Sequence, residues 1–200
     1  IPPNLIRWFA QNLTEYHPKI ESIPVGLENP YILSEVKKIE KVYIQSSKEK
    51  QYKNLCYLNF NPYTNPNERI PIYNKLKDEK WITTEWYQNG QNYENYVNQL
   101  HSNHFILCPE GNNVGHSNNG GGTGSHRVWE CLYLNSIPIV RTGKQSLLFS
   151  DLPILFVDSW EQVTKEFLMD QYYRMLKQEY SINKLKVSYW KYQIALSKIL

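Results

Sequence analysis

Short apolar runs recur through the middle of the chain, and stretches of mixed polar and apolar residues separate them. The runs are four to six residues long and show little alternation between polar and apolar positions. This pattern is typical of strands that are buried on both faces of a sheet. The predicted strands are Leu55–Phe60, Trp81–Trp86, His104–Cys108, Ile137–Val140 and Ile154–Val157.

The stretches between the runs place apolar residues three and four positions apart, which is the spacing of one helix face. They predict helices over Asn92–Asn103, Gly124–Asn135 and Trp160–Leu168. Ser159 and Gln162 have the spacing of a capping box at the start of the third helix.

Two further segments are less regular. Asn65 and Pro66 suit the start of a helix, but Pro71 lacks a backbone N–H and should kink or restart it. Val42–Ile44, in a charged segment before the first strand, fits either an edge strand or part of a helix.

Strands and helices that alternate along most of the chain predict an α/β fold with a doubly wound, Rossmann-like parallel sheet. Such sheets bind ligands outside the carboxyl ends of their strands, near the point where the strand order reverses. The loops that follow the strands are therefore the first place to look for chemistry.

Around this sheet the chain divides into three expected parts. Residues 1–34 read as a connector from a missing or truncated N-terminal domain, with a helix end at Trp8–Asn12 followed by a turn and an extended stretch. Residues 35–168 form the Rossmann-like domain. Residues 169–200 form C-terminal helices that pack on this domain or back toward the N-terminal one.

Composition and charge narrow the class of protein. The 200 residues carry a net charge of only +3, without the concentrated basic stripe of a nucleic-acid-binding domain. No apolar run approaches the ~20 residues of a membrane-spanning helix. Cys56, Cys108 and Cys131 are too widely spaced for a disulfide framework or a metal clip. We expect the protein to lie on the cytoplasmic side of a cell. The abundance of Lys, Asn, Tyr and Ile suggests a bacterial or viral origin.

The loop after the third predicted strand is the most unusual segment, because six glycines fall within residues 111–124. Glycine allows the backbone to approach a ligand closely, and the loop leads into a helix that begins near Gly124 or Ser125. The free N–H groups at a helix N-terminus attract phosphate. A phosphate site is one interpretation of this loop, and a flexible linker is the other.

Arg127 and Glu130 lie three positions apart on this helix and share one face. A guanidinium suits a diphosphate, and a carboxylate one turn further along suits the paired hydroxyls of a ribose. The same two residues could instead form a surface ion pair. The segment has neither the GxxxxGK[ST] nor the GxGxxG spacing, so the pattern alone leaves both alternatives open.

The segments 105–112 and 125–140 resemble the donor-site motif of exostosin-like (family 47-type) GT-B glycosyltransferases. In that family a strand ends in Pro, a charged residue and Gly, and a His-Arg-x-Trp-Glu helix and a Gly-x-Ile-Pro-Val strand follow. Residues 8–26 and 153–160 resemble further segments of the family. Two departures stand out: residues 113–124 are longer than the usual loop, and Asn135-Ser136 replaces a frequent glycine.

The resemblance implies a C-terminal donor-binding domain for a nucleotide sugar with UDP or GDP, and an acceptor that is a glycan or another hydroxyl compound. In this family the reaction needs no obligatory metal, and we expect inversion with a base from the N-terminal domain. The implied diphosphate-binding residues are Gly124, Ser125, His126 and Arg127, with Arg69 as a second candidate. Glu130 would bind the ribose, and Glu110, Gly111 and Asn112 would line the sugar–phosphate pocket.

Two other classes of protein remain as alternatives. The sixteen tyrosines and six tryptophans would suit a non-catalytic module for nucleotides or single-stranded nucleic acid. The chain could instead be a different Rossmann-type enzyme, such as a dinucleotide oxidoreductase, but it does not contain the glycine motif that is usual in such enzymes. No metal site is expected, because His101, His104, His116 and His126 have no carboxylate or cysteine partner at a recognised spacing.

Overall fold

A computed structural model describes residues 1–11, 13, 17–27, 33–85, 92–111, 125–143 and 146–198. Its centre is a five-stranded sheet with the order β4-β3-β5-β6-β7, in which all neighbouring strands are parallel. Every strand of this sheet falls on one of the predicted apolar runs, so these five predictions are confirmed. The strands are β3 (Asn54–Leu58), β4 (Ile82–Thr84), β5 (Asn103–Leu107), β6 (Ile137–Arg141) and β7 (Leu155–Val157).

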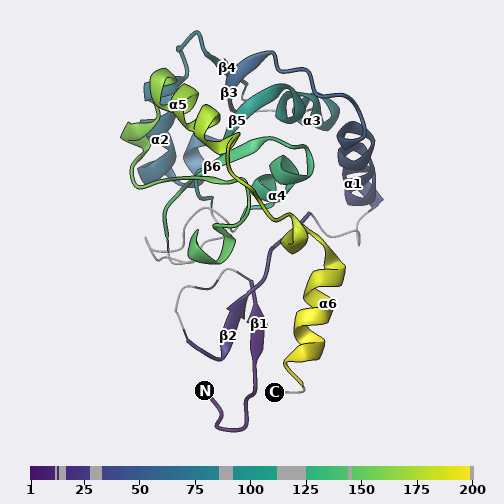
Figure 1. Ribbon diagram of the computed structural model, residues 1–200. Coiled ribbons are helices and arrows are strands. Elements are labelled where there is room, and N and C mark those ends of the chain that lie inside the picture. The colour runs from purple at the N-terminus through teal and green to yellow at the C-terminus, as the bar shows by residue number, and fades with distance from the viewer. Residues whose placement is uncertain are drawn as a thin grey trace.

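Helices cover both faces of the sheet. Along β5, Phe105 and Leu107 pack into one core cluster and Ile106 into the other, as expected for a strand that is buried on both sides. The doubly wound α/β prediction is therefore confirmed (Figure 1). One face is covered by α1 (Leu33–Ser46), α3 (Tyr93–Ser102) and α4 (His126–Tyr133), and the other by α2 (Pro66–Leu76) and α5 (Lys165–Met175).

The helix predictions need three adjustments. Pro71 does not restart the helix, because α2 is continuous and the proline removes only one backbone hydrogen bond from it. Residues 42–44 belong to α1 and not to an edge strand. The capping box of Ser159 and Gln162 closes a short 3-10 helix, and α5 then runs to Met175, through the expected domain end at residue 168.

The connector is also different from its prediction. Trp8–Ala10 is not a helix end but a strand, β1, which pairs in parallel with β2 (Ile20–Ser22). Aromatic residues such as Trp8 and Phe9 favour strands when a partner strand accepts their backbone hydrogen bonds. This pair and α6 (Val187–Leu196) lie together below the sheet domain, where both chain ends are also found (Figure 1).

The order of the strands indicates where along the edge of the sheet a ligand is expected to bind. From β3 the chain moves outward to β4, whereas from β5 it moves the other way to β6 and β7. The order therefore reverses between β3 and β5, and a crevice is expected between the loops that leave these two strands. The N-termini of α2, α3 and α4 lie at the same carboxyl edge, because each helix follows a parallel strand.

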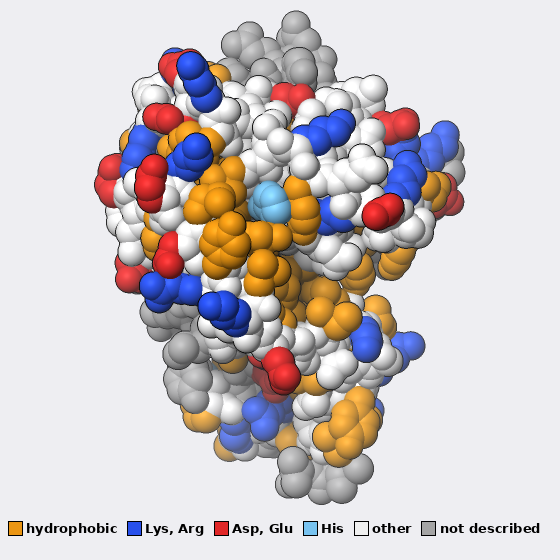
Figure 2. All heavy atoms as spheres, turned by 45° about the horizontal axis from the view of Figure 1, so that its top comes forward, with side chains coloured by type: hydrophobic (Ala, Val, Ile, Leu, Met, Phe, Trp, Pro, Cys, Tyr) orange, Lys and Arg blue, Asp and Glu red, His pale blue; other side chains and the backbone are white. Residues whose placement is uncertain are grey.

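At the opposite, amino edge, an aromatic group forms where β5 begins. The His104 ring stacks on Tyr52, with 3.6 Å between ring centroids, and meets Tyr172 edge-on. Burial, and then the nearby Lys50 ammonium, lowers the pKa of His104 to about 4. Lys50 itself donates to the carbonyl oxygens of Leu134 and Asn135, and so fixes the C-terminal end of α4. Figure 2 shows apolar side chains gathered on one face of the molecule around a histidine.

The lowered pKa of His104 should make the free energy of unfolding depend on pH. An unfolded chain binds a proton at this ring below pH ~6.5, whereas the folded chain binds it only near pH 4, so the free energy of unfolding should decrease as pH falls through that interval. His104→Phe keeps the stacking and should flatten the dependence. Urea unfolding of both proteins between pH 4 and 7 measures the two slopes, and equal slopes would contradict the assignment.

Candidate functional site

The side chain of Arg69, from the first turn of α2, fills the crevice between the loops after β3 and β5. Its Nε donates to the carbonyl oxygen of Glu110 at 2.7 Å, and its Nη2 donates to that of Pro109 at 3.0 Å. Its Nη1 donates to the carbonyl oxygen of Asn61 at 3.1 Å and to the hydroxyl of Thr64. Arg69 therefore joins both loops that leave the strand-order reversal.

This bridge explains why residue 111 is a glycine. A Cβ atom at that position would lie 3.0 Å from Nη2 of Arg69, closer than side-chain atoms normally approach. Burial, and then the positive charge of Arg127, lowers the pKa of Arg69 to about 10, so Arg69 remains protonated at neutral pH. The two guanidinium groups are thus close enough to influence each other.

Arg127 lies at the start of α4 and is half-buried. Its Nε donates to the hydroxyl oxygen of Tyr96 at 3.2 Å, and the Tyr96 hydroxyl donates to Oε2 of Glu130 at 2.7 Å. The hydroxyl of Tyr93 donates to Oε1 of Glu130, also at 2.7 Å. Arg127 and Glu130 are therefore connected through Tyr96, and the alternative of a direct ion pair between them is not observed.

Burial governs the protonation of this chain of groups. Desolvation, and then the Glu130 carboxylate, raises the pKa of Tyr96, so its hydroxyl keeps the proton that it donates. Burial alone would lower the pKa of Arg127, but Tyr96, Cys108 and Glu130 outweigh that effect and the net shift is upward. Glu130 is only 6% exposed, with both oxygens engaged by tyrosines. A ribose could use only the remaining lone pairs of this carboxylate.

The start of α4 is built by its own side chains and by the connector. Ser125 is the N-cap, and its hydroxyl accepts from the backbone N–H of Arg127 at 3.3 Å. The Nδ1 atom of His126 donates to the carbonyl oxygen of Gly26 at 2.8 Å, because a carbonyl can only accept. His126 thus holds the connector against the helix, and its Nε2 has no hydrogen-bond partner among the described residues.

The predicted site residues fall into two groups. Arg69, Glu110 and Gly111 form the bridge across the crevice, whereas Ser125, His126, Arg127 and Glu130 lie along the first two turns of α4. Gly124 and Asn112 lie outside the described residues. The sequence analysis did not single out Tyr93 and Tyr96. Their spacing of three at a helix start, with polar tips, was a usable signal.

The electrostatics of the edge favour an anion. In the described part of the chain, no carboxylate forms an ion pair with Arg69 or Arg127. Within the same part, no group accepts from Nη1 or Nη2 of Arg127. Two partly buried guanidinium groups near helix N-termini are a favourable environment for a phosphate, and the buried Glu110 and Glu130 carboxylates offset part of their charge.

The described residues contain no cluster of three His, Cys, Asp or Glu side chains that could hold a metal ion. His101 contacts Gln45, His104 stacks on Tyr52 and His126 bonds Gly26, while His116 is not described. No helix in the described ranges is long and apolar enough to cross a membrane.

Comparison with known proteins adds no family: no protein-family model matches the sequence, and no curated protein matches it. Fold and site therefore define the class. The chain is an α/β protein with a five-stranded parallel sheet flanked by helices, and the side chains of Arg69 and Arg127 lie at the carboxyl edge of that sheet.

Arg69 should be needed for folding more than for ligand contact. Arg69→Ala would leave the buried carbonyl oxygen of Pro109 without a donor among the described residues and that of Glu110 with the 3.4 Å contact from Asn65, and we expect the free energy of unfolding to fall by ~2–5 kcal/mol. Urea unfolding measures the loss, with exposed Lys80→Ala as the charge-matched control. A loss below ~1 kcal/mol in Arg69→Ala would show that the bridge is not structural.

Proposed function

We propose that this chain binds the diphosphate of a nucleotide sugar at the start of α4 and is the donor-binding domain of a GT-B glycosyltransferase. The carrying observation is the half-buried Arg127 guanidinium, which has no ion-pair partner among the described residues and is oriented by Tyr96. The resemblance of residues 105–112 and 125–140 to the exostosin-like donor motif supports the same assignment.

In the proposed reaction, the bond between the anomeric carbon and the diphosphate oxygen breaks as an acceptor hydroxyl oxygen bonds to that carbon. The acceptor's proton passes to a base. The leaving nucleoside diphosphate takes up negative charge, and a fixed guanidinium beside helix N-termini stabilises charge of this kind. The proposed role of Arg127 is this stabilisation, and it needs no metal ion.

The neighbouring residues have positioning roles in this proposal. Tyr96 holds the Nε of Arg127, which leaves both Nη atoms to form a paired contact with phosphate oxygens. Glu130, held by Tyr93 and Tyr96, is placed one turn further along the helix for the ribose hydroxyls. Arg69 keeps the loop with Glu110 and Gly111 in place beside the sugar–phosphate group. The acceptor's base is proposed to come from another domain.

Calorimetric titration with UDP, GDP and NAD tests the proposal. The wild-type protein should bind UDP or GDP saturably, and Arg127→Ala should weaken that binding by roughly 10- to 100-fold because a charge-assisted contact is lost. Arg174→Ala is the matched control, since Arg174 is an exposed arginine of α5 paired with Asp170. Binding of neither nucleoside diphosphate, or equal binding by both variants, would refute the proposal.

The ribose contact can be tested separately. If Glu130 accepts from ribose hydroxyls, UDP should bind more tightly than 2′-deoxy-UDP by up to about tenfold, the equivalent of one hydrogen bond. Glu130→Gln, which keeps the shape of the side chain, should reduce this preference. A preference that survives in Glu130→Gln would assign the ribose to other residues.

A further inference from the structure

A cavity of about 390 Å³ lies on the other side of α4, where the connector, α1 and α6 meet the sheet domain. Four aromatic residues contribute to its wall: Tyr43 from α1, Trp129 and Tyr133 from α4, and Trp190 from α6. Apolar side chains of the connector, such as Val25 and Leu27, complete it. This volume is within the range of small-molecule sites, which are mostly apolar with few polar groups.

The polar atoms of the wall are mostly engaged already. The Tyr133 hydroxyl donates to the carbonyl oxygen of Leu185 at 2.6 Å, and Nε1 of Trp190 donates to that of Lys184 at 2.8 Å. Lys184 contacts Asp151 at 2.7 Å. A charged or hydroxyl-rich ligand would therefore lose its hydration without gaining partners, which disfavours a sugar in this cavity.

The aromatic wall favours a flat apolar ligand. Tyrosine and tryptophan rings gain most from edge-to-face or offset contacts with another aromatic ring. We propose that the cavity binds an uncharged aromatic molecule.

The cavity is separate from the proposed diphosphate site. Arg127 and Trp129 lie two positions apart on α4, so the cavity and the diphosphate site are on different sides of one helix. His126 binds Gly26, which also lines the cavity, and so joins the two sites at the helix start.

Calorimetry with 2-naphthol tests the cavity, with glucose as the polar comparison. Val187 lines the cavity and is 69% exposed, so Val187→Trp should fill the space without disturbing the core. We expect 2-naphthol to bind the wild-type protein, glucose not to bind, and Val187→Trp to weaken 2-naphthol binding at least tenfold. Val25→Phe blocks the opposite wall and serves if Val187→Trp does not fold.

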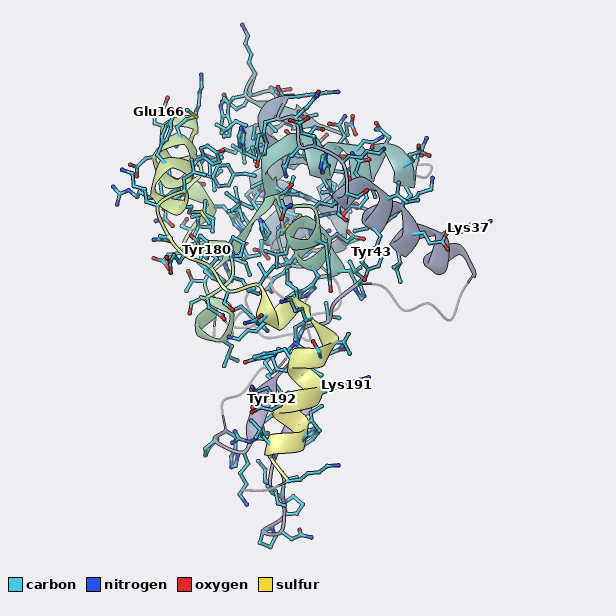
Figure 3. All side chains as sticks on the ribbon, turned by 45° about the vertical axis from the view of Figure 1, so that its right-hand side comes forward. Lys37, Tyr43, Glu166, Tyr180, Lys191 and Tyr192 are labelled. Atoms are coloured by element: carbon cyan, nitrogen blue, oxygen red, sulfur yellow. The ribbon has the colours of Figure 1, made fainter. Side chains whose placement is uncertain are left out.

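The matched control is Tyr192→Trp, an aromatic change on the same helix. Tyr192 is 61% exposed and does not line the cavity, and Figure 3 shows it further along α6, away from the sheet domain. This variant should bind 2-naphthol as the wild type does. No binding by the wild type, or equal binding by a folded blocked variant, would overturn the proposal.

UDP titration of Val187→Trp separates the two proposals. If Val187→Trp still binds UDP but no longer binds 2-naphthol, the result supports two independent sites. If the wild-type protein binds UDP but does not bind 2-naphthol, only the proposal for the cavity is overturned. Binding of 2-naphthol without any nucleoside diphosphate binding keeps the cavity proposal and refutes the proposed function.

Discussion

The hydrogen bonds of Arg69 are the interaction on which the carboxyl edge depends. One buried guanidinium holds the loop after β3 and the loop after β5, and these loops diverge where the strand order reverses. Without Arg69, the carbonyl oxygen of Pro109 would have no donor among the described residues, and a buried carbonyl without a donor costs ~1–3 kcal/mol. The same side chain leaves little room for a Cβ atom at Gly111, which would lie 3.0 Å from Nη2.

The two arginines at this edge have different roles because their hydrogen-bond partners differ. Arg69 uses its N–H groups on backbone carbonyls and a threonine hydroxyl, so it has little left for a ligand. Among the described residues, the Arg127 side chain forms a hydrogen bond only through Nε, to Tyr96. A guanidinium held by one edge would be preorganised for the proposed phosphate, since its orientation is already fixed before the ligand arrives.

Helix α4 organises both proposed sites. Its first turns carry Arg127 and Glu130 toward α3, and its residues Trp129 and Tyr133 line the cavity beside the connector. Lys50 holds the C-terminal end of the helix from the amino edge of the sheet. A helix of eight residues is short for independent stability, so contacts at both ends and on both sides give it a defined position.

The sequence by itself determined the sheet: five apolar runs predicted five buried parallel strands, because burial on both faces leaves a continuous apolar signature. It also identified Arg127 and Glu130 as neighbours on one helix face, because their spacing of three is a local property. Only the tertiary structure decided that Tyr96 stands between them and that Arg69 bridges two loops, since these contacts join residues 31 and 41 positions apart. Side-chain partners across such separations depend on strand order and helix packing, which no local spacing encodes. The parallel pairing of β1 with β2 was missed for the same reason, because a strand at Trp8–Ala10 exists only where a distant segment accepts its hydrogen bonds.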